Sequence, residues 1–155
     1  MVRLSKPAVA SLVVAGLVLG SSLAVVFADA YQDRHMLMEG INDAMKPLGA
    51  IAKKQAPFDA AVVKASATTI AENLKKAHEL FPAGSDGGES RAKPEIWTDR
   101  AGFDQQMKDA QAAAVALSSV KEETAFLPAL RTLGGSCKSC HDMYRLPEKN
   151  PPEKK

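Results

Sequence analysis

The chain has 155 residues, with 20 basic and 18 acidic side chains and a formal net charge of +2. This near balance excludes the strongly basic surface that binding to nucleic acid or to an anionic membrane requires. The length corresponds to about one domain, which would bury roughly two thirds of its unfolded surface.

The first 30 residues have the pattern of a secretory signal peptide. Arg3 and Lys6 form a short basic region, and an uncharged apolar run follows over residues 8–28. A small-x-small cleavage site then ends at Ala30. Two alternatives stay open: a cut after Ala28, and retention of the run as an N-terminal anchor, because the run is nearly long enough to span a bilayer. We expect cleavage, with no stable membrane span afterwards.

Residues 31–146 are predicted to form one helical domain, because apolar residues recur at alternating spacings of three and four. The predicted helices span about 33–53, 59–80, 98–120 and 125–144. Their apolar stripes are Met38, Ile41, Met45 and Leu48; Val63, Ala67, Ile70, Leu74, Ala77 and Phe81; Phe103, Met107, Ala110, Ala114 and Leu117; and Phe126, Leu130, Leu133, Cys137, Cys140 and Tyr144.

The ends of these helices carry local signals. Asp59 is the predicted cap of the second helix, and Thr124 that of the fourth. Pro128 is expected within the first turn of the fourth helix, where a missing N–H is tolerated best. A loop rich in glycine and proline covers 82–97, and the charged tail 147–155 is expected to be disordered.

No segment has the alternation of a strand. Four helices with one apolar stripe each predict an all-α protein, an antiparallel four-helix bundle whose helices cross at shallow angles.

The most specific motif is Cys137-Lys138-Ser139-Cys140-His141, the C-x-x-C-H attachment signature of c-type haem. Two thiols three residues apart on a helix face the same way, and each can form a thioether with one haem vinyl group. The adjacent imidazole of His141 is then held under the iron as the proximal ligand. Both cysteines lie in phase with the apolar stripe, so the haem is expected inside one end of the bundle. Covalent haem attachment and export agree, because c-type assembly is expected outside the cytoplasm, and we expect a periplasmic protein.

Three other interpretations of the cysteine pair stay open. A redox dithiol of the thioredoxin type should lie between a strand and a helix, and no strand pattern precedes Cys137. A zinc site would need two more ligands, for which His35 and His78 are the available imidazoles. A structural disulfide is compatible with export but gives His141 no role.

Beyond this motif, the chain resembles the class II c-type cytochromes, the group that includes cytochrome c′ and the low-spin cytochrome c-556. In that group the haem motif also lies close to the C-terminus of a four-helix bundle. The resemblance covers essentially all of the mature chain. It is carried by Arg34-x-x-x-Met38, Met45-Lys46-Pro47, Gln55-Ala56-Pro57-Phe58-Asp59, Gly87-Gly88 through Lys93-Pro94-Glu95-Ile96-Trp97, and Cys137 through Arg145.

The resemblance implies roles for three further residues. Met38 falls at the distal position opposite His141, and its helical phase agrees, whereas Met36 should face elsewhere. Arg34 resembles the family arginine near the haem propionates, where a planar guanidinium suits carboxylates. Trp97 is implied to pack near the haem edge.

The sixth coordination site of the iron decides the expected function. We expect the thioether of Met38 to bind the iron of a single haem opposite His141, which gives a low-spin iron suited to carrying single electrons. The alternative is a five-coordinate haem of the cytochrome c′ type that binds nitric oxide or carbon monoxide, with Met38 unbound. An enzyme is not expected, because only His35 could supply acid–base chemistry nearby. The expected partners are redox proteins of unknown identity, and the resemblance also implies a homodimer paired through the first two helices.

Overall fold

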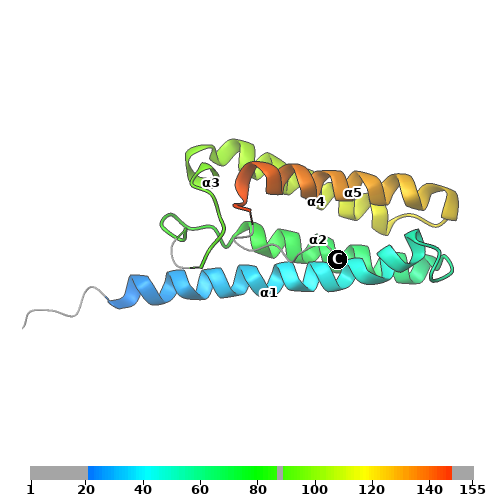
Figure 1. Ribbon diagram of the computed structural model, residues 1–155, viewed down its shortest axis with the longest axis horizontal. Helices are drawn as coiled ribbons and strands as arrows, with labels where there is room; N and C mark the ends of the chain where they lie inside the picture. The colour runs from blue at the N-terminus through cyan, green and yellow to red at the C-terminus, as the bar shows by residue number, and fades with distance from the viewer. Residues whose placement is uncertain (1–20, 87–88, 148–155) are drawn as a thin grey trace, which may run out of the picture.

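The computed structural model describes residues 21–86 and 89–147, and it is helical throughout these ranges apart from turns and loops (Figure 1). The helices are α1 (Ser21–Ala52), α2 (Ala60–His78), α3 (Glu95–Thr98), α4 (Arg100–Ser118) and α5 (Glu123–Tyr144). No strand is present in the described part, where the only β-type pairing is an isolated antiparallel bridge between Ala92 and Arg145. The predicted all-α four-helix bundle is confirmed, with the single-turn helix α3 added in the long loop.

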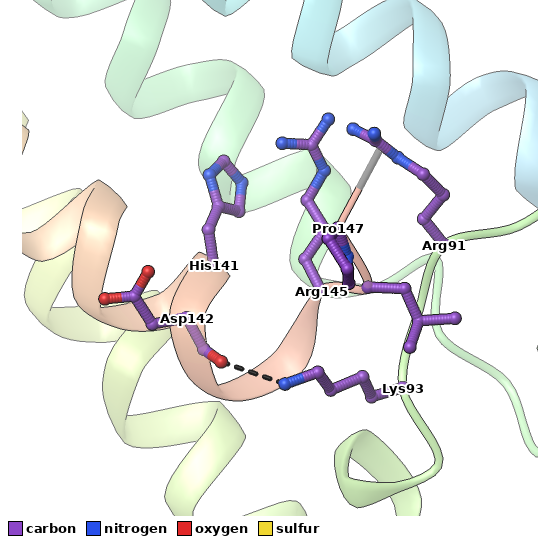
Figure 2. A pocket seen from close by; sticks show the side chains of 7 residues that line it. Arg91, Lys93, His141, Asp142, Arg145 and Pro147 are labelled. Atoms are coloured by element: carbon purple, nitrogen blue, oxygen red, sulfur yellow. Dashed lines mark hydrogen bonds between the residues drawn. The ribbon is translucent and has the colours of Figure 1, made fainter. Parts of the chain in front are cut away.

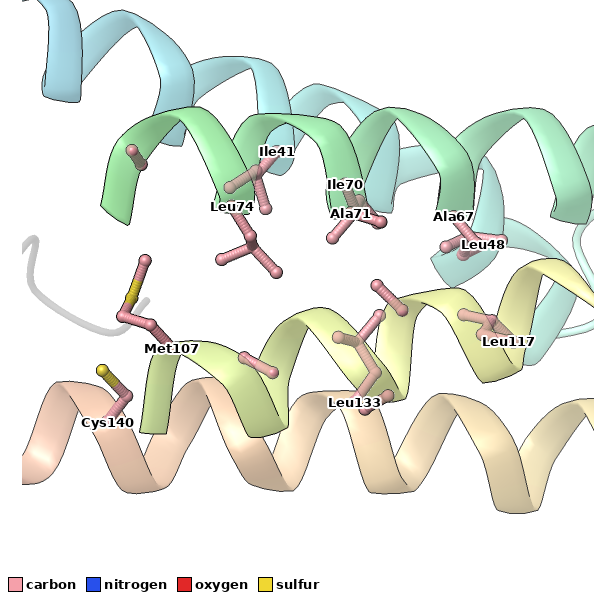
Figure 3. Packing of buried hydrophobic residues seen from close by; sticks show 14 of the residues in the cluster. Ile41, Leu48, Ala67, Ile70, Ala71, Leu74, Met107, Leu117, Leu133 and Cys140 are labelled. Atoms are coloured by element: carbon pink, nitrogen blue, oxygen red, sulfur yellow. The ribbon is translucent and has the colours of Figure 1, made fainter. Parts of the chain in front are cut away.

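The four long helices pack in chain order into two layers. The extensively packed pairs are α1 with α2, α2 with α4, and α4 with α5. In Figure 1, α1 and α2 lie side by side below, and α4 and α5 lie above them. Figure 3 shows the apolar side chains that fill the space between these layers.

The apolar stripes form the core, as the sequence predicts. Every residue of the four predicted stripes either belongs to one buried cluster or packs against it. The largest fully buried side chains are Phe103, Phe126, Leu48, Ile70, Ile96, Leu117, Leu133 and Val63. Burial of these faces is the main term that holds the bundle together, since most of a helix's stability in a protein comes from packing of its apolar face.

The helix caps agree with the sequence in part. Asp59 caps α2, since its side chain accepts hydrogen bonds from the N–H groups of Ala61 and Val62 at 2.8 and 3.3 Å. The predicted cap at Thr124 is wrong, because α5 already begins at Glu123 and Glu122 precedes it without a side-chain hydrogen bond.

Pro128 also lies deeper in α5 than predicted. It is in the second turn, because the helix starts at Glu123, two residues before the predicted start. Its ring nitrogen cannot donate to the carbonyl one turn back, so α5 lacks one internal hydrogen bond there.

The first helix is longer than expected. It starts at Ser21 and so includes residues that the sequence assigns to the signal peptide, and it continues through Pro47 to Ala52. Lys54, with a φ of 57°, turns the chain out of the helix. The first 20 residues of the predicted signal and all but the first residue of the predicted tail lie outside the described residues.

Candidate functional site

The two cysteines lie within the unbroken helix α5, on the side that faces the core. Cys140 is buried with 9% of its surface exposed, and Cys137 is half-buried against the same cluster. Both are free thiols, so they are not joined in a disulfide. Their place inside a helix, with no strand leading into it, argues against a thioredoxin-like dithiol.

The thiols are held in their protonated form. Burial, and to a lesser extent Cys137, raises the pKa of Cys140 to about 11, and burial likewise raises the pKa of Cys137. Reactive redox cysteines have the opposite property, a pKa lowered by nearby positive charge. The pair is therefore poorly suited to disulfide exchange, whereas two thiols on one helix face suit attachment to a planar group with two vinyl substituents.

His141 follows at the edge of a pocket of about 410 Å³ (Figure 2). Its ring points away from α5, and Arg145 and Arg91 line the same pocket. Desolvation by the surrounding protein lowers the pKa of His141, and the charge of Arg91 lowers it further, against the opposing effect of Asp142. The imidazole is therefore neutral at neutral pH, which is the form that binds a metal ion.

The other two histidines do not join this site. His35 pairs with Glu39 at 3.4 Å on the surface of α1, and His78 contacts Asp104 at 2.6 Å between α2 and α4. Within the described ranges there is no group of three or more His, Cys, Asp or Glu residues that could hold a metal ion by themselves. A zinc site at the cysteine pair thus lacks the further ligands that it would need.

Met38 and Met36 take the orientations expected from their helical phase. Met38 is half-buried and packs against the core cluster that also contains Cys140. Met36 is 58% exposed and lines a separate pocket between α1 and α2. Met38 therefore faces inward from α1, in the layer opposite α5, and a ligand role for it stays a prediction.

Arg34 binds the loop that follows α2. It is buried, with 5% exposed, and its terminal nitrogens donate to the chain that follows α2. The acceptors are Leu80 O at 2.6 Å, Ser85 Oγ at 2.9 Å, Ser85 O at 2.8 Å and Ser90 Oγ at 3.3 Å. Burial lowers the pKa of Arg34, and Tyr31 opposes this shift. Both terminal nitrogens are engaged with the loop, and contact with haem propionates stays a prediction.

Trp97 also holds this loop. It lies on α3, packs half-buried against the core, and donates from Nε1 to the carbonyl of Pro82 at 2.9 Å. The structure thus gives Trp97 a place as an aromatic plug, and nearness to the haem edge stays a prediction.

Two residues at the pocket were missed by sequence reasoning. Arg91 and Lys93 line the pocket with His141, and Lys93 donates from Nζ to the carbonyl of Asp142 at 2.9 Å (Figure 2). They come from the long loop, some 50 positions earlier in the chain, so no local pattern could connect them with the haem motif. Both lie in a segment that carries part of the family resemblance, but the resemblance gave neither of them a role at the haem.

These residues together fit a c-type haem. Two protonated thiols lie on one face of α5, a neutral imidazole follows them, and apolar side chains from α1 and α4 line the neighbouring core. Among the residues that the structure describes, no helix is long and apolar enough to cross a membrane.

Comparisons with known proteins agree with this site. Residues 29–145 match the model of the family described as Cytochrome C′. A cytochrome c′ from Rhodopseudomonas palustris is 42% identical over 135 residues, covering 85% of this chain and 92% of the relative. A cytochrome c-556 from Agrobacterium fabrum is 38% identical over 125 residues, covering 79% of this chain and 85% of the relative.

Solved structures lead to the same family. The structure of cytochrome c′ from Rhodopseudomonas palustris has a TM-score of 0.73 at 39% identity, covering 79% of this chain and 98% of that chain. The nitric oxide complex of a mutant cytochrome c prime from Alcaligenes xylosoxidans has a TM-score of 0.72 at 30% identity, covering 79% of this chain and 97% of that chain. The chain therefore belongs to the cytochrome c′ family, which includes cytochrome c-556, and it is a four-helix bundle that carries a c-type haem on Cys137 and Cys140.

Proposed function

We propose that this protein is a haem protein of the cytochrome c′ type that binds small gases such as nitric oxide or carbon monoxide. The observation that carries the proposal is the similarity of the chain to cytochrome c′. One cytochrome c′ is 42% identical in sequence, and several solved structures of cytochrome c′ have the same fold, one of them a nitric oxide complex. When bound, the haem supplies an iron with one axial position available to a diatomic ligand.

The chain's own residues divide the remaining tasks. Cys137 and Cys140 anchor the haem through thioethers, and His141 offers a neutral imidazole as the proximal ligand. Met38, facing inward from α1, fills the distal side as a bulky apolar side chain and limits which molecules can approach. The exposed side chain of His35 is paired with Glu39, so it is poorly placed as an acid–base group, and we propose no enzymatic reaction.

A second candidate function rests on Met38 itself. A thioether is a suitable axial ligand for iron, and opposite a histidine it favours a low-spin haem that transfers single electrons. The 38% identity to a cytochrome c-556 supports this candidate. In that case Met38 occupies the sixth position and excludes the gases.

We further propose a periplasmic location. A basic region, an apolar run and a small-x-small site open the chain, as in a secretory signal peptide. This export signal is consistent with covalent haem attachment, which is expected outside the cytoplasm.

Absorption spectra of the haem-loaded protein, ferric and ferrous, with and without carbon monoxide, test the first proposal against the second. The gas-binding proposal predicts a high-spin spectrum that shifts with carbon monoxide. A Met38→Ala variant should then bind carbon monoxide about tenfold faster or more, because the blocking side chain is gone.

A sharp low-spin spectrum that carbon monoxide leaves unchanged would refute gas binding. The electron-carrier candidate then predicts that Met38→Ala converts the protein to a high-spin form. Met36→Ala is the matched control, since Met36 is exposed on the other side of α1 and should change neither spectrum.

A further inference from the structure

Arg34 is a buried cation whose acceptors are neutral oxygens. Its four hydrogen bonds go to carbonyl and hydroxyl groups of Leu80, Ser85 and Ser90, and its guanidinium lies 4.7 Å from the centre of the Phe81 ring. Burying a guanidinium is costly unless its donors are satisfied. Arg34 is buried despite this cost, and it lies on α1 four residues before Met38. Its hydrogen bonds to the loop are therefore expected to have a specific role.

Ser90 carries these contacts further along the loop. Its hydroxyl oxygen accepts from Arg34 Nη2 at 3.3 Å and also from the backbone N–H of Ala92 at 3.2 Å. Arg34 is thereby linked to the segment 91–93.

The segment 91–93 pairs in turn with the end of α5. Arg91 O accepts from the N–H of Leu146 at 2.7 Å, and the N–H of Lys93 donates to Tyr144 O at 3.0 Å. An antiparallel bridge joins Ala92 to Arg145 between these two bonds. The last turn of α5 contains His141, whose carbonyl accepts a hydrogen bond from the N–H of Arg145 at 3.0 Å.

These hydrogen bonds, from Arg34 through Ser90 and residues 91–93, connect two helices that pack little against each other. Helices α1 and α5 are not among the extensively packed pairs of the bundle, although one carries Met38 and the other His141. In Figure 1 the end of α5 lies next to the loop that leads into α3, where Ala92 pairs with Arg145. Met38 follows Arg34 by one helical turn, about 6 Å along the axis.

We propose that Arg34 is a positioning residue: through Ser90 and residues 91–93, it sets where the His141 turn of α5 lies relative to the Met38 turn of α1. The inference rests on the fold and the haem attachment, and it applies to either candidate function. Contact of Arg34 with the haem propionates is a separate prediction, which this inference does not require.

Hydrogen–deuterium exchange of the haem-loaded protein tests this role without any gas. In an Arg34→Met variant, peptides that contain the N–H groups of Lys93 and Leu146 should exchange about tenfold faster or more, because loss of a hydrogen bond to a charged group shifts a local opening equilibrium by that order. The absorption bands that report axial coordination should shift in the same variant. Arg34→Lys should not restore either property, since one ammonium group cannot replace two terminal nitrogens that together bind four acceptors.

Ser90→Ala isolates the proposed route, because it leaves Arg34 and its other three acceptors in place. We expect it to raise exchange at the same two amides, and it serves as the test if Arg34→Met does not fold. Arg131→Met, a charge loss on the exposed face of α5, is the matched control and should change nothing.

Folded Arg34→Met or Ser90→Ala protein with unchanged exchange at Lys93 and Leu146 would overturn the inference. A spectral change without faster exchange would also overturn it, because Arg34 would then act directly on the haem. Failure of gas binding leaves these exchange rates unaffected, so the two proposals fail separately.

Discussion

Tyr144 shows how one side chain joins the end of α5 to the start of α4. It is 3% exposed, and its hydroxyl donates to Asp99 Oδ2 at 2.7 Å, while its ring meets the edge of Phe103. The other oxygen of Asp99 accepts from the N–H of Gly102 at 3.2 Å and caps α4. Burial, followed by the bond to Asp99, raises the pKa of Tyr144 to about 12.

This shift predicts a loss of stability in alkali. Below about pH 10 both the folded and the unfolded chain keep the phenol proton of Tyr144. Between about pH 10 and 12 the unfolded chain releases it and the folded chain keeps it, so the free energy of unfolding falls as pH rises. Urea unfolding from pH 9 to pH 12 should show this fall, and a Tyr144→Phe variant should lack that part of it. Equal pH profiles for the two proteins would contradict the assignment.

At the scale of elements, a glycine in α4 is crowded by neighbouring side chains, whereas a glycine in α5 has open space beside it. A Cβ atom at Gly102 in α4 would lie 2.2 Å from Asp99 Oδ2 and 2.6 Å from Tyr144 Oη. A Cβ atom at Gly135 in α5 would meet nothing within 4 Å. Gly102 is required because the side chains of Asp99 and Tyr144 lie where a Cβ atom would be. Gly135 has no such neighbour, and its lack of a side chain only weakens the helix.

The same substitution should therefore have opposite effects at the two positions. Gly135→Ala should raise the free energy of unfolding by about 1 kcal/mol, the difference in helix propensity between the two residues. Gly102→Ala should lower it by about 1–3 kcal/mol, because the Asp99 carboxylate and Tyr144 must move apart. Denaturant unfolding of both variants measures the two changes, and a loss of stability in Gly135→Ala would show that this face of α5 is not open.

The helices themselves were predictable, and their ends only in part: Asp59 caps α2 as predicted, whereas the starts of α1 and α5 were misplaced. Apolar spacing located every core stripe, because burial of one face is what selects these helices. The start of α5 was misplaced, since Glu122 and Glu123 carry no apolar signal and their backbone geometry alone opens the helix. The start of α1 was misplaced because an apolar signal sequence and an apolar helix have the same local pattern.

At the scale of the whole molecule, the candidate site combines both layers of the bundle. Cys137, Cys140 and His141 were predictable from sequence because one local motif contains them. The environment of Arg34 and the pocket residues Arg91 and Lys93 were not predictable, because their contacts depend on how the long loop returns across the bundle.

The haem itself should stabilise this two-layer arrangement. A double variant with Cys137→Ala and Cys140→Ala cannot form the thioethers, and it should unfold about 5–10 °C lower, the shift that ~2 kcal/mol causes in a domain of this size. Its helical content should persist at low temperature, because the apolar cluster forms between the helices themselves.

Thermal unfolding followed by circular dichroism compares this variant with the haem-loaded protein. Ser139→Ala, on the exposed residue between the two cysteines, is the control and should unfold at the wild-type temperature. A double variant that unfolds at that temperature too would mean that the haem adds no stability to the bundle.

The pairing of residues 91–93 with the end of α5 also sets an order of events during synthesis. The contact between Lys93 and Asp142 spans 49 positions, so it forms only when nearly the whole domain has emerged. The last two turns of α5 also contain both thiols and His141. Residues 91–93 therefore lack their hydrogen-bond partners until the end of α5 has been made, although Arg34 already binds Ser85 and Ser90. A nascent chain that stops before Tyr144 should be cut readily by proteases at residues 91–93.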